Sequence, residues 1–127
     1  MNQVTEIMNN DPMFCTSETR IAEIKHLLKK YDYKELLVLD SEKDRHPIGV
    51  VSLEDMASEA IEHGAMPSDT SAVECMRSIP AVVAENSSYE ECLNVMRQNH
   101  MDFIPVVDMN GHVTGVVERE KLTKMLM

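Results

Sequence analysis

The chain has 127 residues, of which 43% are hydrophobic, and its formal net charge at pH 7 is −10. This length suits one compact domain or two small units that share a core, and the negative charge, with no block of Lys or Arg to offset it, argues against nucleic acid as a direct partner. The apolar runs are far too short to span a bilayer and no signal segment follows Met1, so we expect no membrane association and a cytoplasmic location.

The first half of the chain predicts five elements in the order strand, helix, strand, strand, helix. Helices are indicated by apolar residues at intervals of three and four, and strands by short apolar runs bounded by turn residues. The hairpin between the inner strands contains a polar excursion that we interpret as a solvated loop, where extra length costs little. The elements are the strand 13–16, the helix 21–31, the strands 36–40 and 48–51, and the helix from 53 to about 62.

The second half repeats these elements after a polar linker, 64–71. Its first helix follows Ser87-x-x-Glu90, which predicts a capping box in which a hydroxyl and a carboxylate satisfy free backbone N–H groups. Its hairpin contains Asn110-Gly111, which predicts a type I′ turn because both residues accept a positive φ angle. The elements are the strand 82–84, the helix 89–96, the strands 104–108 and 113–117, and the helix from 119 to about 125.

The two halves correspond at a constant spacing. Met8 and Asp40 recur as Met76 and Asp108, in each case 68 residues later. An offset kept over such a distance indicates a duplicated supersecondary unit, so the differences between the copies become informative.

We therefore predict an α/β fold of the α+β kind, built from two β-α-β-β-α repeats. The first repeat is assigned to residues 1–63, the linker to 64–71 and the second repeat to 72–127. A three-stranded sheet with helices on one face leaves its other face uncovered, and the second repeat is the obvious cover. We expect a pseudo-twofold pair with a cleft between the repeats.

Cysteine and histidine give no sign of a disulfide or a metal centre. Three cysteines cannot all pair within the chain. Cys75 and Cys92 stand where the other copy has Ile7 and Ile24, so we interpret them as buried thiols. The five histidines are scattered without ligand spacing, and we predict no metal site.

Several stretches of the two copies resemble a known family, the tandem cystathionine-β-synthase (CBS) domain pair, often called a Bateman module. They are GVVSLED at 49–55, IPVVD at 104–108, NG at 110–111 and GVV at 115–117. The resemblance covers essentially the whole chain. It implies a regulatory module that requires no cofactor, binds AMP, ADP, ATP or S-adenosylmethionine in the cleft between repeats, and pairs into a homodimer.

The resemblance also implies which residues hold ribose and phosphate, namely Gly49, Ser52 and Asp55. Glycine would allow a ligand to approach the backbone, serine would sit at a helix N-terminus that favours phosphate, and aspartate would accept from ribose hydroxyls. The Ser-x-x-Asp spacing is equally that of a self-contained helix cap. Both interpretations stay open on the sequence alone.

The second copy departs from this pattern, with Glu118 and Lys121 in place of Ser52 and Asp55. A carboxylate at the start of a helix competes with phosphate for the same N–H groups. We therefore expect one good site rather than two. Arg119 is a candidate phosphate contact, with an exposed helical arginine as the alternative.

The adenine base, by the same resemblance, is expected against the segment Pro12, Met13 and Phe14, with apolar help from Ile48. Met13 and Phe14 could equally be ordinary core. A further departure from the family is Leu37, where the second copy has a proline.

Three functions are weighed. The leading hypothesis is a regulatory module that senses an adenosine-containing ligand and passes its state to a partner. The alternative is a dimerisation or partner-docking module whose ligand site has decayed, which Glu118 and Lys121 favour. An enzyme is not expected, because no Ser/His/Asp set, P-loop or paired-carboxylate arrangement stands out.

Overall fold

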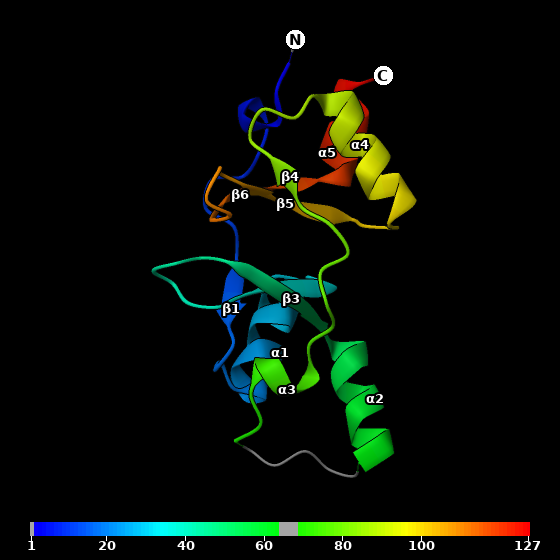
Figure 1. Cartoon of the computed structure of the whole chain (residues 1–127). Coiled ribbons are helices and arrows are strands. Elements are labelled where there is room, and N and C mark those ends of the chain that lie inside the picture. The colour runs from blue at the N-terminus through cyan, green and yellow to red at the C-terminus, as the bar shows by residue number, and fades with distance from the viewer. Residues whose placement is uncertain (1, 64–68) are drawn as a thin grey trace. The chain divides into compact units, whose positions relative to one another are not determined.

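The structure of the chain is a computed structural model that describes residues 2–63 and 69–127, so most of the predicted linker lies outside the described residues. The chain forms two compact units (Figure 1). The first unit consists of residues 13–79, and the second unit of residues 1–12 together with 80–127. Each unit contains one three-stranded sheet.

The first unit has the sheet order β1-β2-β3. The connection through α1 makes β1 and β2 parallel, whereas the hairpin makes β2 and β3 antiparallel. Figure 1 shows the helices of this unit on one side of its sheet. The elements are β1 (Phe14–Thr16), α1 (Ile21–Lys30), β2 (Glu35–Leu39), β3 (Pro47–Ser52), α2 (Leu53–His63) and α3 (Ala72–Cys75).

The second unit repeats this topology with the sheet order β4-β5-β6, again with one parallel and one antiparallel pair. The predicted fold class is therefore confirmed. The elements are the 3₁₀ helix η1 (Val4–Glu6), β4 (Val83–Ala84), α4 (Tyr89–Gln98), β5 (Phe103–Val107), β6 (Val113–Glu118) and α5 (Arg119–Met125).

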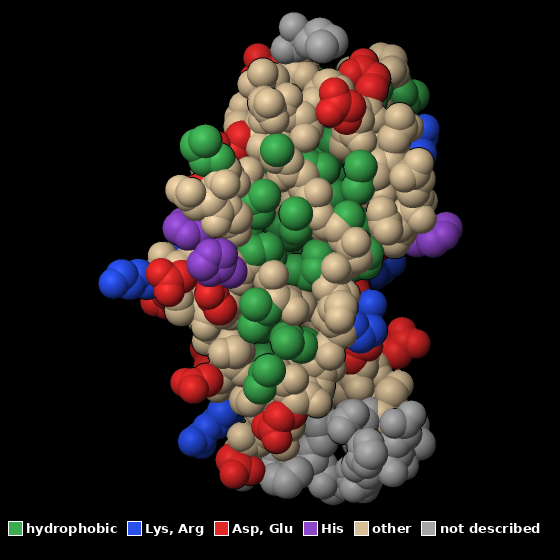
Figure 2. All heavy atoms as spheres, in the orientation of Figure 1, with side chains coloured by type: hydrophobic (Ala, Val, Ile, Leu, Met, Phe, Trp, Pro, Cys, Tyr) green, Lys and Arg blue, Asp and Glu red, His purple; other side chains and the backbone are tan. Residues whose placement is uncertain are grey.

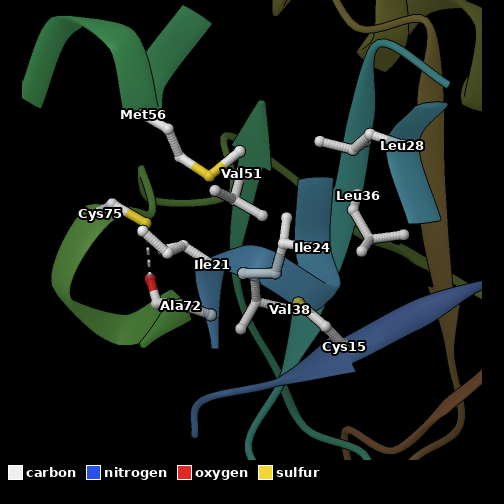
Figure 3. Close-up of a cluster of buried hydrophobic side chains, with 10 residues drawn as sticks. All are labelled: Cys15, Ile21, Ile24, Leu28, Leu36, Val38, Val51, Met56, Ala72 and Cys75. Atoms are coloured by element: carbon white, nitrogen blue, oxygen red, sulfur yellow. Dashed lines mark hydrogen bonds between the residues drawn. The ribbon is translucent and has the colours of Figure 1, made fainter. Parts of the chain in front are cut away.

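The core of the first unit lies between its sheet and its helices (Figure 3). The apolar spacing of α1 buries Ile21, Ile24 and Leu28 on one face of the helix. Cys15 belongs to the same cluster, and burial raises the pKa of its thiol to about 12. All three cysteines are buried and stand outside any disulfide, which confirms their interpretation as buried thiols. The cluster comprises Cys15, Ile21, Ile24, Leu28, Leu36, Val38, Val51, Met56, Ala72 and Cys75.

The segment ahead of the first strand of each repeat is duplicated as well. η1 and α3 are 68 residues apart, and each carries a capping box, Gln3 with Glu6 and Ser71 with Glu74. Yet η1 belongs to the second unit, whereas α3 belongs to the first. The compact units in space are thus interleaved along the sequence, and the assignment of repeats to 1–63 and 72–127 stays a description of the sequence.

The capping box predicted at Ser87 and Glu90 is wrong by one residue. The residue that caps α4 is Ser88, whose Oγ accepts a hydrogen bond from the backbone N of Glu91 at 3.1 Å. The carbonyl of Ser87 instead accepts from the backbone N of Val4 at 3.0 Å. Because this bond ties Ser87 to the N-terminal segment, the N-cap falls one residue later, at Ser88, and the helix itself begins at Tyr89, as the apolar spacing predicts.

The type I′ turn predicted at Asn110-Gly111 is also wrong. Gly111 has a φ of 81°, but Asn110 is not among the residues with positive φ. The backbone N of Gly111 donates to the carbonyl of Asp108 at 3.0 Å. Oδ1 of Asp108 accepts from the backbone N of Asn110 at 2.9 Å and of His112 at 3.0 Å. These bonds favour an Asx-stabilised turn in place of type I′.

The hairpin of the first unit is stabilised by the equivalent aspartate, Asp40. Oδ1 of Asp40 accepts from the backbone N of Ser41 at 2.7 Å and of His46 at 2.8 Å. The side chain of His46 contacts the other carboxylate oxygen at 2.7 Å, and this hydrogen bond is the main reason that the pKa of Asp40 is lowered. Arg45, with a φ of 57°, stands before the histidine as Gly111 does in the second unit.

Candidate ligand-binding site

Ser52 and Asp55 lie where β3 runs into α2. Oδ2 of Asp55 accepts from the backbone N of Ser52 at 3.0 Å and from its Oγ at 2.8 Å. The backbone N of Asp55 donates to Oγ of Ser52 at 3.0 Å. The two residues therefore form the helix cap that their spacing also predicts. This cap fixes both side chains at the start of α2.

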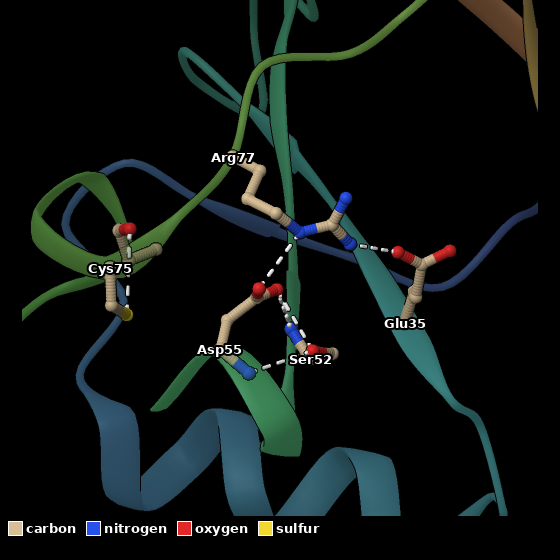
Figure 4. A network of polar contacts seen from close by, with 6 residues as sticks. Glu35, Ser52, Asp55, Cys75 and Arg77 are labelled. Atoms are coloured by element: carbon tan, nitrogen blue, oxygen red, sulfur yellow. Dashed lines mark hydrogen bonds and ion pairs between the residues drawn. The ribbon is translucent and has the colours of Figure 1, made fainter. Parts of the chain in front are cut away.

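The other oxygen of Asp55 is held by Arg77, which follows α3 (Figure 4). Nε of Arg77 donates to Oδ1 of Asp55 at 2.8 Å, and its Nη2 forms an ion pair with Glu35 at the start of β2. The backbone N and O of Arg77 pair with the O and N of Val50 at 2.8 and 2.9 Å. Burial alone would lower the pKa of this guanidinium, but the bonds to both carboxylates raise it.

Glycine is required at position 49 because another segment of the chain packs closely against it. A Cβ at this position would lie 2.6 Å from Sδ of Met76 and 2.8 Å from the carbonyl O of Arg77. Gly115, in the copy without the Ser/Asp pattern, would place a Cβ 2.6 Å from Sδ of Met8. Since both glycines are crowded in the same way, the close approach at Gly49 is made by the segment after α3.

The apolar residues predicted to contact a base lie on or beside the sheet of the first unit. Met13 and Ile48 pack against its core, which favours the core interpretation for Met13. Phe14 is half-buried and, by strand alternation, faces away from Cys15 and the core cluster. The guanidinium carbon of Arg45 lies 5.0 Å from the centroid of the Phe14 ring. Phe14 is therefore the best placed of the three for contact outside this core.

Pro12 and Arg119 belong to the second unit, whereas the other predicted site residues belong to the first. Arg119 is the first residue of α5, and its backbone N donates to the carbonyl of Asp102 at 2.8 Å. Its side chain is half-buried. The contribution of Pro12 and Arg119 to a ligand site stays a prediction.

The second copy has no counterpart to this polar network. Where α2 begins with a serine cap, α5 is preceded by Glu118 and has no side-chain capping bond. The positions of Glu35, Ser52 and Asp55 in the first copy correspond to Phe103, Glu118 and Lys121 in the second. Arg77, which lies in the second copy but packs in the first unit, corresponds to Asn9.

Glu35 and Arg77 are functional candidates that the sequence analysis does not single out. The duplication gives no signal for this pair, because Glu35 lies in the first copy and Arg77 in the second. Their equivalents, Phe103 and Asn9, are uncharged, but only the fold brings Arg77 into the unit that contains Glu35. The pairing itself depends on tertiary structure, since 42 residues separate the two side chains.

Neither a membrane span nor a metal cluster is found in the described part of the chain. None of its helices is long and apolar enough to cross a bilayer. No group of three or more His, Cys, Asp or Glu side chains there is placed to hold a metal ion. The face drawn in Figure 2 carries acidic side chains on both units, in keeping with the net charge of −10.

The fold consists of two copies of a three-stranded β-α-β-β-α unit. One copy has a serine–aspartate cap where β3 runs into α2. These features define a class of tandem α+β repeat proteins. The chain belongs to the CBS domain family, which it matches twice, over residues 4–62 and 71–127.

Comparison with known proteins agrees with this assignment. The inosine-5'-monophosphate dehydrogenase of Mycobacterium tuberculosis is 26% identical over 118 residues, which are 92% of this chain but only 21% of the dehydrogenase. The chain thus spans about a fifth of the length of that relative.

Solved structures show the same fold. CBSX2 in complex with AMP has a TM-score of 0.80 at 19% identity, covering 99% of this chain and 96% of that one. The CBS domain pair of protein MJ0100, in complex with 5'-methylthioadenosine and S-adenosyl-L-methionine, has a TM-score of 0.77 at 21% identity, with coverage of 99% and 96%.

Proposed function

We propose that this chain is a regulatory module that binds an adenosine-containing ligand, such as AMP, ADP, ATP or S-adenosylmethionine, and passes its state to a partner protein. Family membership supports this, as do the adenosine-type ligands bound by similar structures. The observation that carries the proposal is the fixed pair of Ser52 and Asp55 at the start of α2.

The hydrogen bonds of Asp55 leave room for one more donor. A carboxylate oxygen can accept two hydrogen bonds. Oδ2 already accepts two from Ser52, whereas Oδ1 accepts one from Arg77. One place on Oδ1 is thus available to a ribose hydroxyl. The N-terminus of α2 supplies a partial positive charge that favours a phosphate nearby.

The rest of the proposed site follows the family pattern. We place the base against Pro12, Met13 and Phe14 with Ile48, the ribose near Asp55, and the phosphate near Ser52 with Arg119 as a further contact, in a cleft between the repeats. The proposal includes no catalytic step and no required cofactor. It also includes a homodimer in the cytoplasm, for which native mass spectrometry of freshly purified protein reports oligomeric state and any retained nucleotide.

A second function is tested as well, because the polar groups of the site bind mainly one another. Ser52, Asp55 and Arg77 are joined by hydrogen bonds. A partner-docking module with a decayed ligand site would retain such a network. The two functions differ in whether an adenosine ligand binds at all.

Isothermal titration with AMP, ATP and S-adenosylmethionine separates the two functions. We expect saturable heat for at least one ligand, and a loss of at least tenfold in affinity in a Ser52→Ala, Asp55→Ala double variant. Ser88→Ala is the matched control, because it removes a helix cap in the second unit without touching the site. No heat with any ligand at millimolar concentration would favour the docking function.

A further inference from the structure

Arg77 is held in place by two carboxylates from different elements. Its Nε donates to Asp55 at the start of α2, and its Nη2 pairs with Glu35 at the start of β2. The side chains of Asp55 and Glu35 are 16% and 28% exposed, whereas that of Arg77 is 51% exposed. The carboxylates hold one side of the guanidinium, and its other side is exposed to solvent. Arg77 is therefore placed to contact a ligand.

The guanidinium keeps free hydrogen-bond donors. An arginine side chain has five N–H donors, and the described residues engage one on Nε and one on Nη2. Figure 4 shows the third nitrogen, Nη1, pointing away from both carboxylates. Because the side chain is already ordered, an anion that binds it does not have to immobilise it first.

The donor geometry of Arg77, rather than net charge, decides what kind of ligand gains from this arrangement. Arg77 compensates one of its two carboxylates, so Glu35, Asp55 and Arg77 together keep one negative charge, and the net charge of the chain adds to it. The guanidinium nevertheless offers a planar fork of donors that suits phosphate oxygens. The residue that corresponds to Arg77 in the duplication, Asn9, carries no charge.

We propose that Arg77 is the residue that determines ligand specificity, so that the Ser52/Asp55 site takes an adenosine ligand bearing a phosphate in preference to an uncharged or sulfonium-bearing one. This inference rests on the proposed function, since it concerns the same site. It assigns to Arg77, within the first unit, the cationic phosphate contact for which the sequence offers Arg119 as the candidate.

The test compares adenosine, AMP and S-adenosylmethionine by isothermal titration against the full chain and an Arg77→Gln variant. We expect the unaltered chain to bind AMP at least tenfold more tightly than either other ligand. Arg77→Gln should lower the affinity for AMP about tenfold or more, which is the range of a charge-assisted hydrogen bond. The same substitution should change the affinity for adenosine less than about twofold. Arg97→Gln, an exposed residue of the second unit, makes the same change in net charge and should leave all affinities unchanged.

Each other outcome overturns the inference in a recognisable way. An equal loss of affinity for AMP and for adenosine would show that Arg77 only positions Asp55 and does not contact the phosphate. No loss for AMP, or tighter binding of S-adenosylmethionine than of AMP by the unaltered chain, would remove Arg77 as the determinant of specificity. If the unaltered chain binds adenosine but not AMP, the inference fails while the proposed function stands. If none of the three binds, the inference fails, and if ADP and ATP also give no heat, the proposed function fails with it.

Discussion

Gly49 and Gly115 leave no room for a side chain because in both units a neighbouring segment of the chain pairs with the last strand at the next residue. In the first unit that segment includes Arg77, whose backbone makes two hydrogen bonds with Val50. The carbonyl that crowds Gly49 therefore cannot move away without loss of this pairing. The same segment carries the guanidinium that holds Asp55. At the scale of the residue, Gly49 positions the polar network without belonging to it.

Gly49→Ala should lower the free energy of unfolding by about 1–3 kcal/mol, the usual range for an overpacked site. The added methyl would meet Sδ of Met76 at 2.6 Å and the backbone carbonyl of Arg77 at 2.8 Å. Urea unfolding followed by circular dichroism measures the change. A Met76→Ala substitution in the same background should restore only part of the loss, because the carbonyl remains. A Gly49→Ala protein as stable as the parent would contradict this account of the glycine.

The sequence points to Gly49, Ser52 and Asp55 through the family resemblance, but the roles of these residues depend on contacts between distant segments. The pattern at Gly49, Ser52 and Asp55 is visible in the chain, and so is the helix cap as an alternative. Local spacing cannot show that Arg77 takes one oxygen of Asp55, because 22 residues separate them. Nor can it show that the space beside Gly49 is filled by the protein itself.

At the scale of the element, the apolar periodicity is sufficient to predict every strand and long helix, but the ends of elements depend on tertiary contacts. Ser87-x-x-Glu90 fits a capping box, which predicts Ser87 as the N-cap of α4. The preceding residues also offer Ser88, and the two serines cannot be ranked by spacing alone. The N-cap is decided by Val4, whose backbone N donates a hydrogen bond to the carbonyl of Ser87. A residue more than eighty positions away thus decides which serine caps the helix.

Substitution of each serine separates these roles. Ser88→Ala removes the acceptor for the backbone N of Glu91 and should lower stability by about 1 kcal/mol, as is usual for loss of a helix cap. Ser87→Ala is the matched control and should change stability by less than about 0.5 kcal/mol, because Ser87 contributes its backbone carbonyl. Urea unfolding of both variants provides the comparison. An equal loss in the two variants would show that the capping role is shared.

At the scale of the whole molecule, the two compact units are interleaved along the chain. η1 precedes β1 in sequence but packs in the second unit, whereas α3 precedes β4 but packs in the first. Repeat spacing shows that these two segments are equivalent, yet it cannot show which sheet each joins, since both units would offer similar partners. The strands of each repeat therefore pack with the segment that leads into the strands of the other repeat.

The interleaving predicts where a buried N-terminal residue acts. Ile7 is 7% exposed and belongs to the second unit, so Ile7→Ala should lower stability by about 2–5 kcal/mol and reduce amide hydrogen-exchange protection mainly in α4 and β5. Met56→Ala, at a residue 1% exposed in the first unit, is the matched control and should reduce protection mainly in α1 and β2. If Ile7→Ala instead loosens α1 and β2, the N-terminal segment stabilises the repeat that it precedes in sequence, and the interleaved arrangement is refuted.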